Sequence, residues 1–272
     1  MNTKAQLGSE TAKGGFANEK DICNKFNDWK NDTEANIWLK IMGYDTDKLN
    51  SVVAIQVPTK IKKSDLQKFD VTESDYNEFV RFKKADAQIR IIITIGGILK
   101  IETLSLKKAN ANAGFNQIDK RTVDSYQTMW GFDDEITHWL KLFTGAIIPS
   151  TELKSRDNRR LFLDEMPIEI QNKILDFFSR NKILIISDIL KDRGGLSANW
   201  MLVTKLNQAE NTTTWILKDI NSVMNFYGQG NVTISPRGSF NIGKIGVQRK
   251  GGTPDPTKLQ FKFDPNNLFN PN

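Results

Sequence analysis

A β-hairpin signal in residues 84–108 constrains the fold of this chain more than any other stretch. Isoleucines dominate the run from Ile89 to Ile95, and a second run that favours strand extends from Ile98 to Lys108. Only Gly96 and Gly97 separate the two runs. Because a pair of glycines suits the two-residue turn between antiparallel strands, the stretch predicts a tight hairpin.

A two-residue turn also fixes which residues of the two strands pair. Counting back from the glycines places Gln88 opposite Ser105 and Asp86 opposite Lys107. Directly paired residues share one face of a sheet, and so do residues two apart along a strand. We therefore expect Asp86, Ser105 and Lys107 to converge near the open end of the hairpin.

A carboxylate, a hydroxyl and an ammonium gathered in one place suit metal-assisted attack on a phosphodiester. Asp86 is the candidate Mg²⁺ ligand, Ser105 offers a second oxygen, and Lys107 orients a water or neutralises charge on phosphorus. The alternative is a surface hairpin with an ordinary Asp and Lys pair at its mouth, because this spacing is a loose pattern.

Composition narrows the class of protein. The 272 residues are 39% hydrophobic and 26% charged, which is typical of a soluble globular chain. No apolar run approaches the ~20 residues needed to span a bilayer, and the polar start lacks the order of a secretion signal, so we expect a cytoplasmic protein without a membrane partner. One cysteine, Cys23, and one histidine, His138, exclude an internal disulfide and a His or Cys zinc site.

Positive charge is concentrated in residues 228–264. From Gly228 to Lys262 the chain has six Lys or Arg residues and one acid, Asp255, and so carries a net charge of +5 against +6 for the whole chain. A basic segment rich in Gly, Gln, Ser and Asn is expected of a surface that follows phosphates and reads base edges. The alternative is a plain solvated face.

Two predicted strands in this basic segment show an alternating pattern. In residues 258–263, Lys and Gln alternate with Leu and Phe, so Gln260 and Lys262 are expected on the free face. In residues 239–250 the same period places Lys244, Gln248 and Lys250 on one face. Neighbouring strands that present Gln and Lys can reach a DNA groove as a β-ribbon does.

Residues 109–121 are small and polar and predict no core element. Phe115, Asn116 and Gln117 stand in this stretch soon after Lys107. An exposed Phe can wedge between base steps, and amides can pair with base edges. The alternative is that Phe115 folds back onto the core.

Periodicity predicts the remaining elements. Helices are expected at residues 17–29, 34–42, 123–143 and 164–181, which gives a helical middle over residues 121–182. Strands are expected at residues 52–57, 199–206, 212–217 and 231–235, and residues 182–190 form a short apolar run, either strand or buried turn. No linker forces a boundary, so we expect a single domain over residues 1–272.

Several segments resemble type II restriction endonucleases of the HinP type, which cut GCGC, and more distantly those of the MspI type. The resemblance is carried by GFANEKDI near the start, KADAQI before the hairpin, GFNQIDK after it, and SPRGS, QRKGG and LQFKFDP near the end. It implies an α/β (α+β) fold with the restriction-endonuclease-like core of the PD-(D/E)xK superfamily, a mixed central sheet flanked by helices.

The resemblance also implies roles for residues of the hairpin. Asp86, Ser105 and Lys107 fall on the catalytic positions, with Asp86, Ser105 and the backbone carbonyl of Leu106 as metal ligands. Ser105 departs from the pattern, because the family more often has Glu, Gln or Asn there and a hydroxyl is a weaker Mg²⁺ ligand. Whether another acid helps is left open, with Glu19, Glu102 and Asp119 as candidates.

The implied activity is Mg²⁺-dependent hydrolysis of both strands of a short GC-rich duplex, GCGC, leaving 5′-phosphates. The implied partners are double-stranded DNA, a second copy in a homodimer, and a DNA methyltransferase of matching specificity. The residues expected to contact DNA are Phe115, Asn116, Gln117, Lys120, Arg237, Lys244, Gln248, Arg249, Lys250, Gln260 and Lys262.

Three rival functions stay open at the level of sequence. One keeps the nuclease chemistry but acts on branched or mismatched DNA, as a repair endonuclease does. A second is sequence-specific DNA binding without catalysis, which Ser105 in place of an acid makes plausible. In the third, the basic segment near the C-terminus contacts a protein or a membrane instead of DNA.

Overall fold

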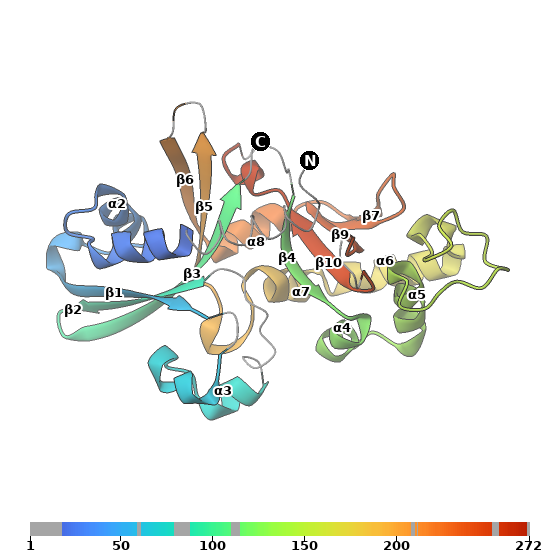
Figure 1. Ribbon diagram of the computed structural model, residues 1–272, viewed down its shortest axis with the longest axis horizontal. Helices are drawn as coiled ribbons and strands as arrows, with labels where there is room; N and C mark the ends of the chain where they lie inside the picture. Colours follow the sequence, from blue (N-terminus) through green and yellow to red (C-terminus); the bar gives the residue numbers. More distant parts are fainter. Residues whose placement is uncertain are drawn as a thin grey trace, which may run out of the picture. The chain divides into compact units, whose positions relative to one another are not determined.

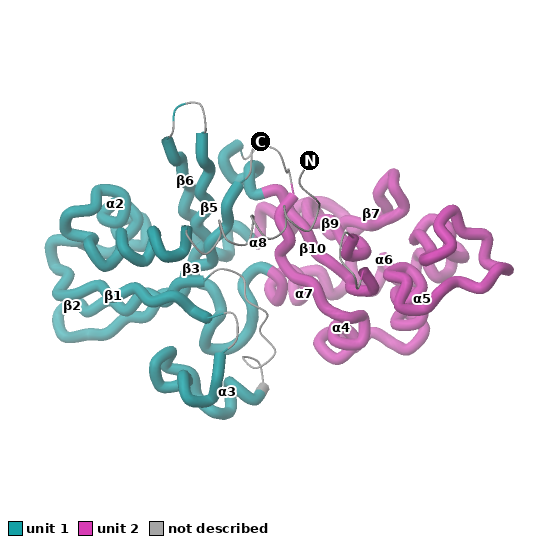
Figure 2. The backbone as a smooth tube through the Cα atoms, viewed as in Figure 1, with its two compact units in different colours: residues 1–114, 190–223, 265–272 teal, residues 115–189, 224–264 magenta. Residues whose placement is uncertain are grey.

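The structure is a computed structural model that describes residues 18–58, 61–78, 88–109, 115–207, 210, 212–251 and 256–270. The chain divides into two compact units (Figure 2). Unit 1 comprises residues 1–114, 190–223 and 265–272, and unit 2 comprises residues 115–189 and 224–264. The expectation of a single domain over residues 1–272 stays a prediction. Asp86 lies outside the described residues.

Unit 1 is built on a mixed five-stranded sheet (Figure 1). Its order is β1 (Leu49–Val57), β2 (Gln88–Ile95), β3 (Ile98–Ala109), β5 (Trp200–Asn207) and β6 (Thr212–Asp219). Neighbours are antiparallel except for β3 and β5, which run parallel. The predicted mixed sheet is therefore confirmed.

The β2–β3 hairpin has the predicted turn and register. Gly96 and Gly97 adopt φ angles of 55° and 80°, which favour glycine, and the Gly96 amide donates to Asn50 Oδ1 over 2.9 Å. The pairing runs without a shift from Ile95 and Ile98 at the turn to Gln88 and Ser105.

Apolar side chains cover both faces of this sheet. On one face Leu104 and Leu106 join a core with residues of the helix over 18–27 and of α2 (Thr33–Ile41), which begins where Asp32 accepts a hydrogen bond from the Ala35 amide. On the other face Val57 packs in a second apolar cluster with Leu196 of η6 (Gly194–Leu196), Phe69 of η3 (Gln67–Phe69) and Tyr76 of α3 (Glu73–Glu78). The chain between β1 and β2 also contains η2 (Lys63–Asp65). Figure 1 shows α2 and α3 on opposite sides of the strands.

Unit 2 has its own five-stranded sheet, in which every neighbouring pair is antiparallel. Its order is β4 (Asn116–Arg121), β10 (Leu259–Phe263), β9 (Ile245–Arg249), β8 (Phe240–Ile242) and β7 (Val232–Ile234). The packing helices are α4 (Val123–Trp130), α5 (Asp134–Thr144) and α6 (Ile168–Arg180). Phe261 of β10 meets the rings of Tyr126 and Trp130 at centroid distances of 5.2 and 5.5 Å.

The other described elements are short. They are α7 (Lys182–Leu190), α8 (Ile220–Gly228), η1 (Thr46–Lys48), η5 (Leu163–Glu165) and η7 (Pro265–Leu268). No helix in the described part of the chain has the length and apolar character needed to cross a membrane.

Four sequence predictions of secondary structure were wrong. Residues 116–121 form strand β4, because hydrogen-bonded pairing with β10 stabilises a strand that their small and polar composition does not favour. The run at 182–190 is helix α7, and the helix expected at 123–143 is divided at Gly131, which caps α4 with a φ of 73°. The strand expected over 239–250 is the hairpin of β8 and β9.

Candidate active site

Ser105 and Lys107 lie on the same face of β3 in unit 1. Ser105 pairs with Gln88 on β2 and with Met201 on β5, and Lys107 pairs with Val203 on β5. Only 2% of Ser105 and 6% of Lys107 are exposed. Ser105 and Lys107 therefore share a face of the sheet, as the predicted register requires, whereas the convergence of Asp86 with them stays a prediction.

Glu102 serves a structural role on the other face of β3. Its carboxylate accepts hydrogen bonds from the Tyr44 hydroxyl at 2.6 Å and from Trp200 Nε1 at 3.0 Å. It alternates along the strand with Ser105, as the predicted register requires. Glu102 is thus directed away from the side of Ser105 and Lys107.

Glu19 is buried near the start of the helix over residues 18–27. It precedes Cys23 by one turn, and Cys23 packs in the core with Leu104 and Leu106, on the face opposite Ser105. Burial raises the pKa of Glu19 from 4.5 to about 7. Burial also raises the pKa of the Cys23 thiol, and the charge of Glu19 raises it further, to about 12. Glu19 is therefore an acid that keeps its proton far more readily than an exposed Glu.

Asp119, the third acid considered, is held within unit 2. Its carboxylate accepts from Arg121 Nε at 2.9 Å and from the Lys120 amide at 2.7 Å. Among the described residues no group of three or more His, Cys, Asp or Glu is arranged to hold a metal ion. That Asp86 supplies a carboxylate ligand beside Ser105 stays a prediction.

One face of the unit 2 sheet collects amides and lysines from three strands. Gln260 on β10 lies between Lys120 on β4 and Gln248 on β9, and in the next row Lys262 pairs with Gln117. Gln260 Nε2 donates to Gln117 Oε1 over 2.7 Å, and Gln260 Oε1 is buried without a hydrogen-bond partner among the described residues. We call these five residues the amide-lysine face.

Positive charge is dense on this face. Burial lowers the pKa of Lys250, and the charges of Lys120 and Lys262 lower it further, so the three ammonium groups lie near one another. Burial also lowers the pKa of Lys262. The acidic residue Asp119 pairs with Phe261, whose side chain packs on the face of the sheet opposite to the amide-lysine face. The arrangement suits an anionic partner that offers hydrogen-bonding edges.

Comparison with known proteins decides the class of protein. A family model described as R.HinP1I restriction endonuclease matches residues 70–269. The chain belongs to this family. A crystal structure of the restriction endonuclease MspI in complex with its cognate DNA superposes with a TM-score of 0.61 at 15% sequence identity, covering 95% of this chain and 92% of that chain. The comparison with curated proteins gave no match.

The predicted fold and enzyme class are thereby confirmed. The protein is a type II restriction endonuclease, a site-specific nuclease, with the mixed sheet and flanking helices of the restriction-endonuclease fold. DNA binding without catalysis, one of the rival functions, does not fit membership of this family.

Three of the residues expected to contact DNA in this restriction endonuclease stand apart from the amide-lysine face. Lys244 lies in the turn between β8 and β9, with Nζ 3.6 Å from the ring centre of Phe226. Arg249 alternates with Gln248 and Lys250, so it faces the other way, and its Nε donates to the Pro256 carbonyl over 3.3 Å. Arg237 is exposed in the turn between β7 and β8. Their contacts with DNA stay predictions.

Phe115 and Asn116 lie at the start of β4. Asn116 pairs with Phe263 of β10, and Phe115, immediately before the strand, is 60% exposed. The alternative in which Phe115 folds back onto the core is therefore wrong. An exposed aromatic ring is left free for a partner.

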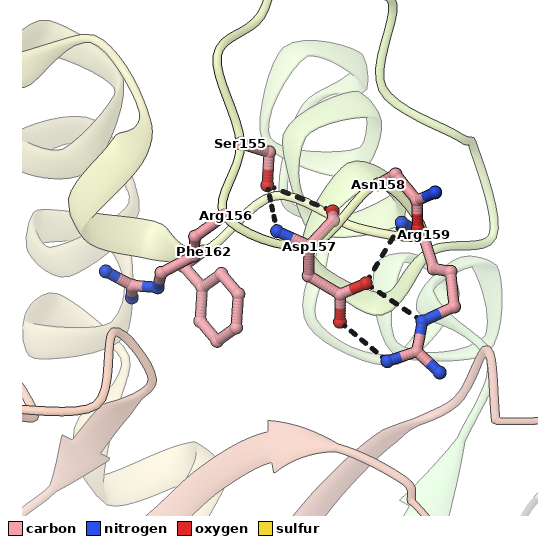
Figure 3. A pocket seen from close by; sticks show the side chains of 6 residues that line it. All are labelled: Ser155, Arg156, Asp157, Asn158, Arg159 and Phe162. Atoms are coloured by element: carbon pink, nitrogen blue, oxygen red, sulfur yellow. Dashed lines mark hydrogen bonds and ion pairs between the residues drawn. The ribbon is translucent and has the colours of Figure 1, made fainter.

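Unit 2 of the nuclease has a pocket, lined by residues 155–159 and Phe162, that was not predicted from the sequence (Figure 3). The guanidinium groups of Arg156 and Arg160 stack on the Phe162 ring at 4.0 and 3.8 Å. The Arg159 side chain donates two hydrogen bonds to Asp157, and these bonds are the main cause of an Asp157 pKa lowered to about 2. Arg156 is paired with Asp164, at 2.7 Å. Because these arginines are already paired, the cluster stabilises its own loop rather than offering free charge.

Proposed function

We propose that this restriction endonuclease hydrolyses phosphodiester bonds in both strands of a short GC-rich duplex, GCGC, with Mg²⁺ as cofactor, and leaves 5′-phosphates. The observation that carries the proposal is the register of the β2–β3 hairpin, which runs without a shift as far as Gln88 and places Ser105 and Lys107 on one face of β3. If this register continued by two residues, it would pair Asp86 with Lys107.

The donor set fits a hard divalent cation. Asp86 would supply a carboxylate, Ser105 a hydroxyl and Leu106 a backbone carbonyl, all of them oxygen ligands of the kind that Mg²⁺ takes. When bound, Mg²⁺ supplies charge that polarises the phosphate and lowers the pKa of a coordinated water.

Lys107 acts on the reacting groups directly. Its ammonium donates hydrogen bonds, so it orients the attacking water and stabilises the charge that develops on the phosphate oxygens. Burial strengthens this interaction, because a charge in a poorly solvated site acts through a lower effective dielectric than it would in water. With 6% of the residue exposed, Lys107 meets that condition.

The amide-lysine face reads the bases. Lys120 and Lys262, with the neighbouring Lys250, suit the O6 and N7 acceptors of guanine, and Gln117, Gln248 and Gln260 can both donate to and accept from base edges. Arg237 contacts phosphate, Lys244, Arg249 and Asn116 support the contact, and Phe115 wedges between base steps. A DNA substrate agrees with the MspI structure, which was solved with its cognate DNA.

The wider setting follows from the class of enzyme. One hairpin provides one hydrolytic site per chain, so a double-strand break takes either a homodimer or two successive nicks. A methyltransferase of matching specificity would protect the host's own sites.

Digestion of a sequenced plasmid tests the proposal. With Mg²⁺, the enzyme should give discrete fragments, and sequencing of their ends should place every cut in GCGC with a 5′-phosphate. With EDTA the plasmid should stay intact. Cuts at another short motif would refute GCGC alone, and activity confined to branched or mismatched DNA would favour a repair endonuclease.

A further inference from the structure

Gln260 is a buried amide in the middle of the amide-lysine face. It lies on β10 between Lys120 and Gln248, and only 1% of it is exposed. Its Nε2 donates to Gln117 Oε1 over 2.7 Å. Gln117 itself is exposed, on the edge strand β4. A base can therefore reach Gln117, whereas Gln260 offers almost no surface of its own to a partner.

This hydrogen bond fixes how the Gln117 carboxamide is turned. A carboxamide has an acceptor oxygen on one side of its terminal carbon and an NH₂ group with two donors on the other. With Oε1 held by the buried Gln260, Nε2 of Gln117 is directed away from the interior.

The direction of the bond agrees with the charges around it. Gln260 Oε1 stays a buried acceptor without a hydrogen-bond partner among the described residues, and it lies on a face whose lysines can only donate. The reverse bond, from Gln117 to Gln260, would instead bury an unpaired NH₂ group among positive charges. An acceptor is the better group to leave there.

The orientation of Gln117 decides which base edge it can read. An unrestrained Gln suits adenine, because it donates from its nitrogen and accepts with its oxygen in one bidentate contact. With its oxygen engaged by Gln260, Gln117 offers donors alone. Those donors match guanine, whose N7 and O6 are both acceptors, whereas the amino group of adenine would meet another donor.

We propose that Gln260 is a positioning residue for site recognition, which holds Gln117 so that it reads guanine and discriminates against adenine. The inference rests on the proposed function, in which the amide-lysine face reads bases. Gln260 then acts through Gln117 and not through a base contact of its own. This role gives a physical reason why a face rich in glutamine suits a GC-rich site.

A double-mutant cycle on discrimination tests this dependence. Single-turnover cleavage by the full-length enzyme is compared between the site mapped by plasmid digestion and sites in which each G·C pair in turn is changed to A·T. Gln117→Ala should lower discrimination at one pair by about tenfold. Gln260→Met, which keeps the side-chain length and removes the donor, should lower it at the same pair and should have no further effect when combined with Gln117→Ala.

Gln171→Met is the matched control for loss of an amide. Gln171 of α6 also donates through Nε2, to the Met166 carbonyl at 2.7 Å, so its replacement can lower the melting temperature but should leave discrimination unchanged. If Gln260→Met also lowers the melting temperature, Gln260→Glu decides, because a carboxylate only accepts. Gln117 must then donate inward and turn its oxygen outward, so the preference for guanine over adenine should fall. An unchanged preference would refute the proposal.

The cycle separates this inference from the proposed function. Losses that multiply in the double variant, or a loss at a different base pair, would overturn the positioning role, since Gln260 would then contact a base independently. Full discrimination in Gln260→Met would overturn it as well. If Gln117→Ala itself keeps full discrimination, the reading role of the amide-lysine face fails together with the inference.

Discussion

A single step along β3 separates side chains with different roles. Leu104 and Leu106 are core residues, while Ser105 and Lys107 between and beyond them face the candidate site. The sequence was sufficient to predict this division. The two-residue turn sets the register of the hairpin, and the alternation of side chains along a strand then decides which face each residue takes.

The buried carboxyl of Glu19 makes stability depend on pH. Its pKa is raised from 4.5 to about 7 in the folded chain, so the folded state holds the proton more tightly than the unfolded state does. The stability contributed by this proton is complete below about pH 4.5 and is lost as pH rises to about 7. Glu19→Gln should therefore stabilise the metal-free enzyme at pH 8 by on the order of 2–3 kcal/mol, as measured by urea unfolding.

The gain from Glu19→Gln should shrink as pH falls and vanish near pH 4.5. Glu34→Gln is a suitable control, because Glu34 is more exposed and pairs with Lys25 and Trp215. An equal gain at pH 4.5 and pH 8 would show that the Glu19 carboxyl does not titrate in this range.

If the amide-lysine face reads bases, its mutations should affect site-specific cleavage more than they affect general affinity for DNA. Gln248→Ala and Lys262→Ala should lower cleavage at the correct site far more than they lower binding to unrelated duplex, because a base contact is typically worth about 1–3 kcal/mol of discrimination. Cleavage rates and binding by gel shift measure the two effects. Lys173→Ala, a lysine of α6 that pairs with Asp133 and Glu135 and is not among the expected DNA contacts, is the control and should change neither assay. Equal losses in both assays would make Gln248 and Lys262 phosphate contacts.

At the scale of elements, the β2–β3 hairpin depends on its turn. Gly97 has a φ of 80°, and nothing lies within 4 Å of where a Cβ would stand, so a substitution there acts through the backbone alone. Gly97→Val should destabilise the enzyme by about 1–2 kcal/mol or more, as measured by thermal unfolding. Gly96→Asn should be tolerated, because Asn-Gly is favoured in such turns. A stable Gly97→Val variant would contradict the turn geometry.

Local sequence predicted the elements that bury a regular apolar stripe and failed where pairing decides. The isoleucine-rich strand β2 and the helix α6 were predicted close to their observed limits. The polar strand β4 was missed, because its strand state depends on pairing with β10, more than a hundred residues away. The position of β4 also decides which residues Gln260 contacts, so the hydrogen bond between Gln260 and Gln117 could not be predicted from the sequence.

At the scale of the whole molecule, the proposed function assigns hydrolysis and site recognition to different units. Ser105 and Lys107 belong to unit 1, and the amide-lysine face belongs to unit 2. We therefore expect that mutations can alter hydrolysis and site recognition independently.

Single-turnover cleavage of a duplex with one GCGC site, compared among the wild type, Asp86→Ala and Lys107→Ala in Mg²⁺, tests the central claim most directly. Both variants should still bind the duplex and should cut it at least about a hundredfold more slowly. Cleavage at the wild-type rate by both variants would contradict the assignment of the active site to the β2–β3 hairpin.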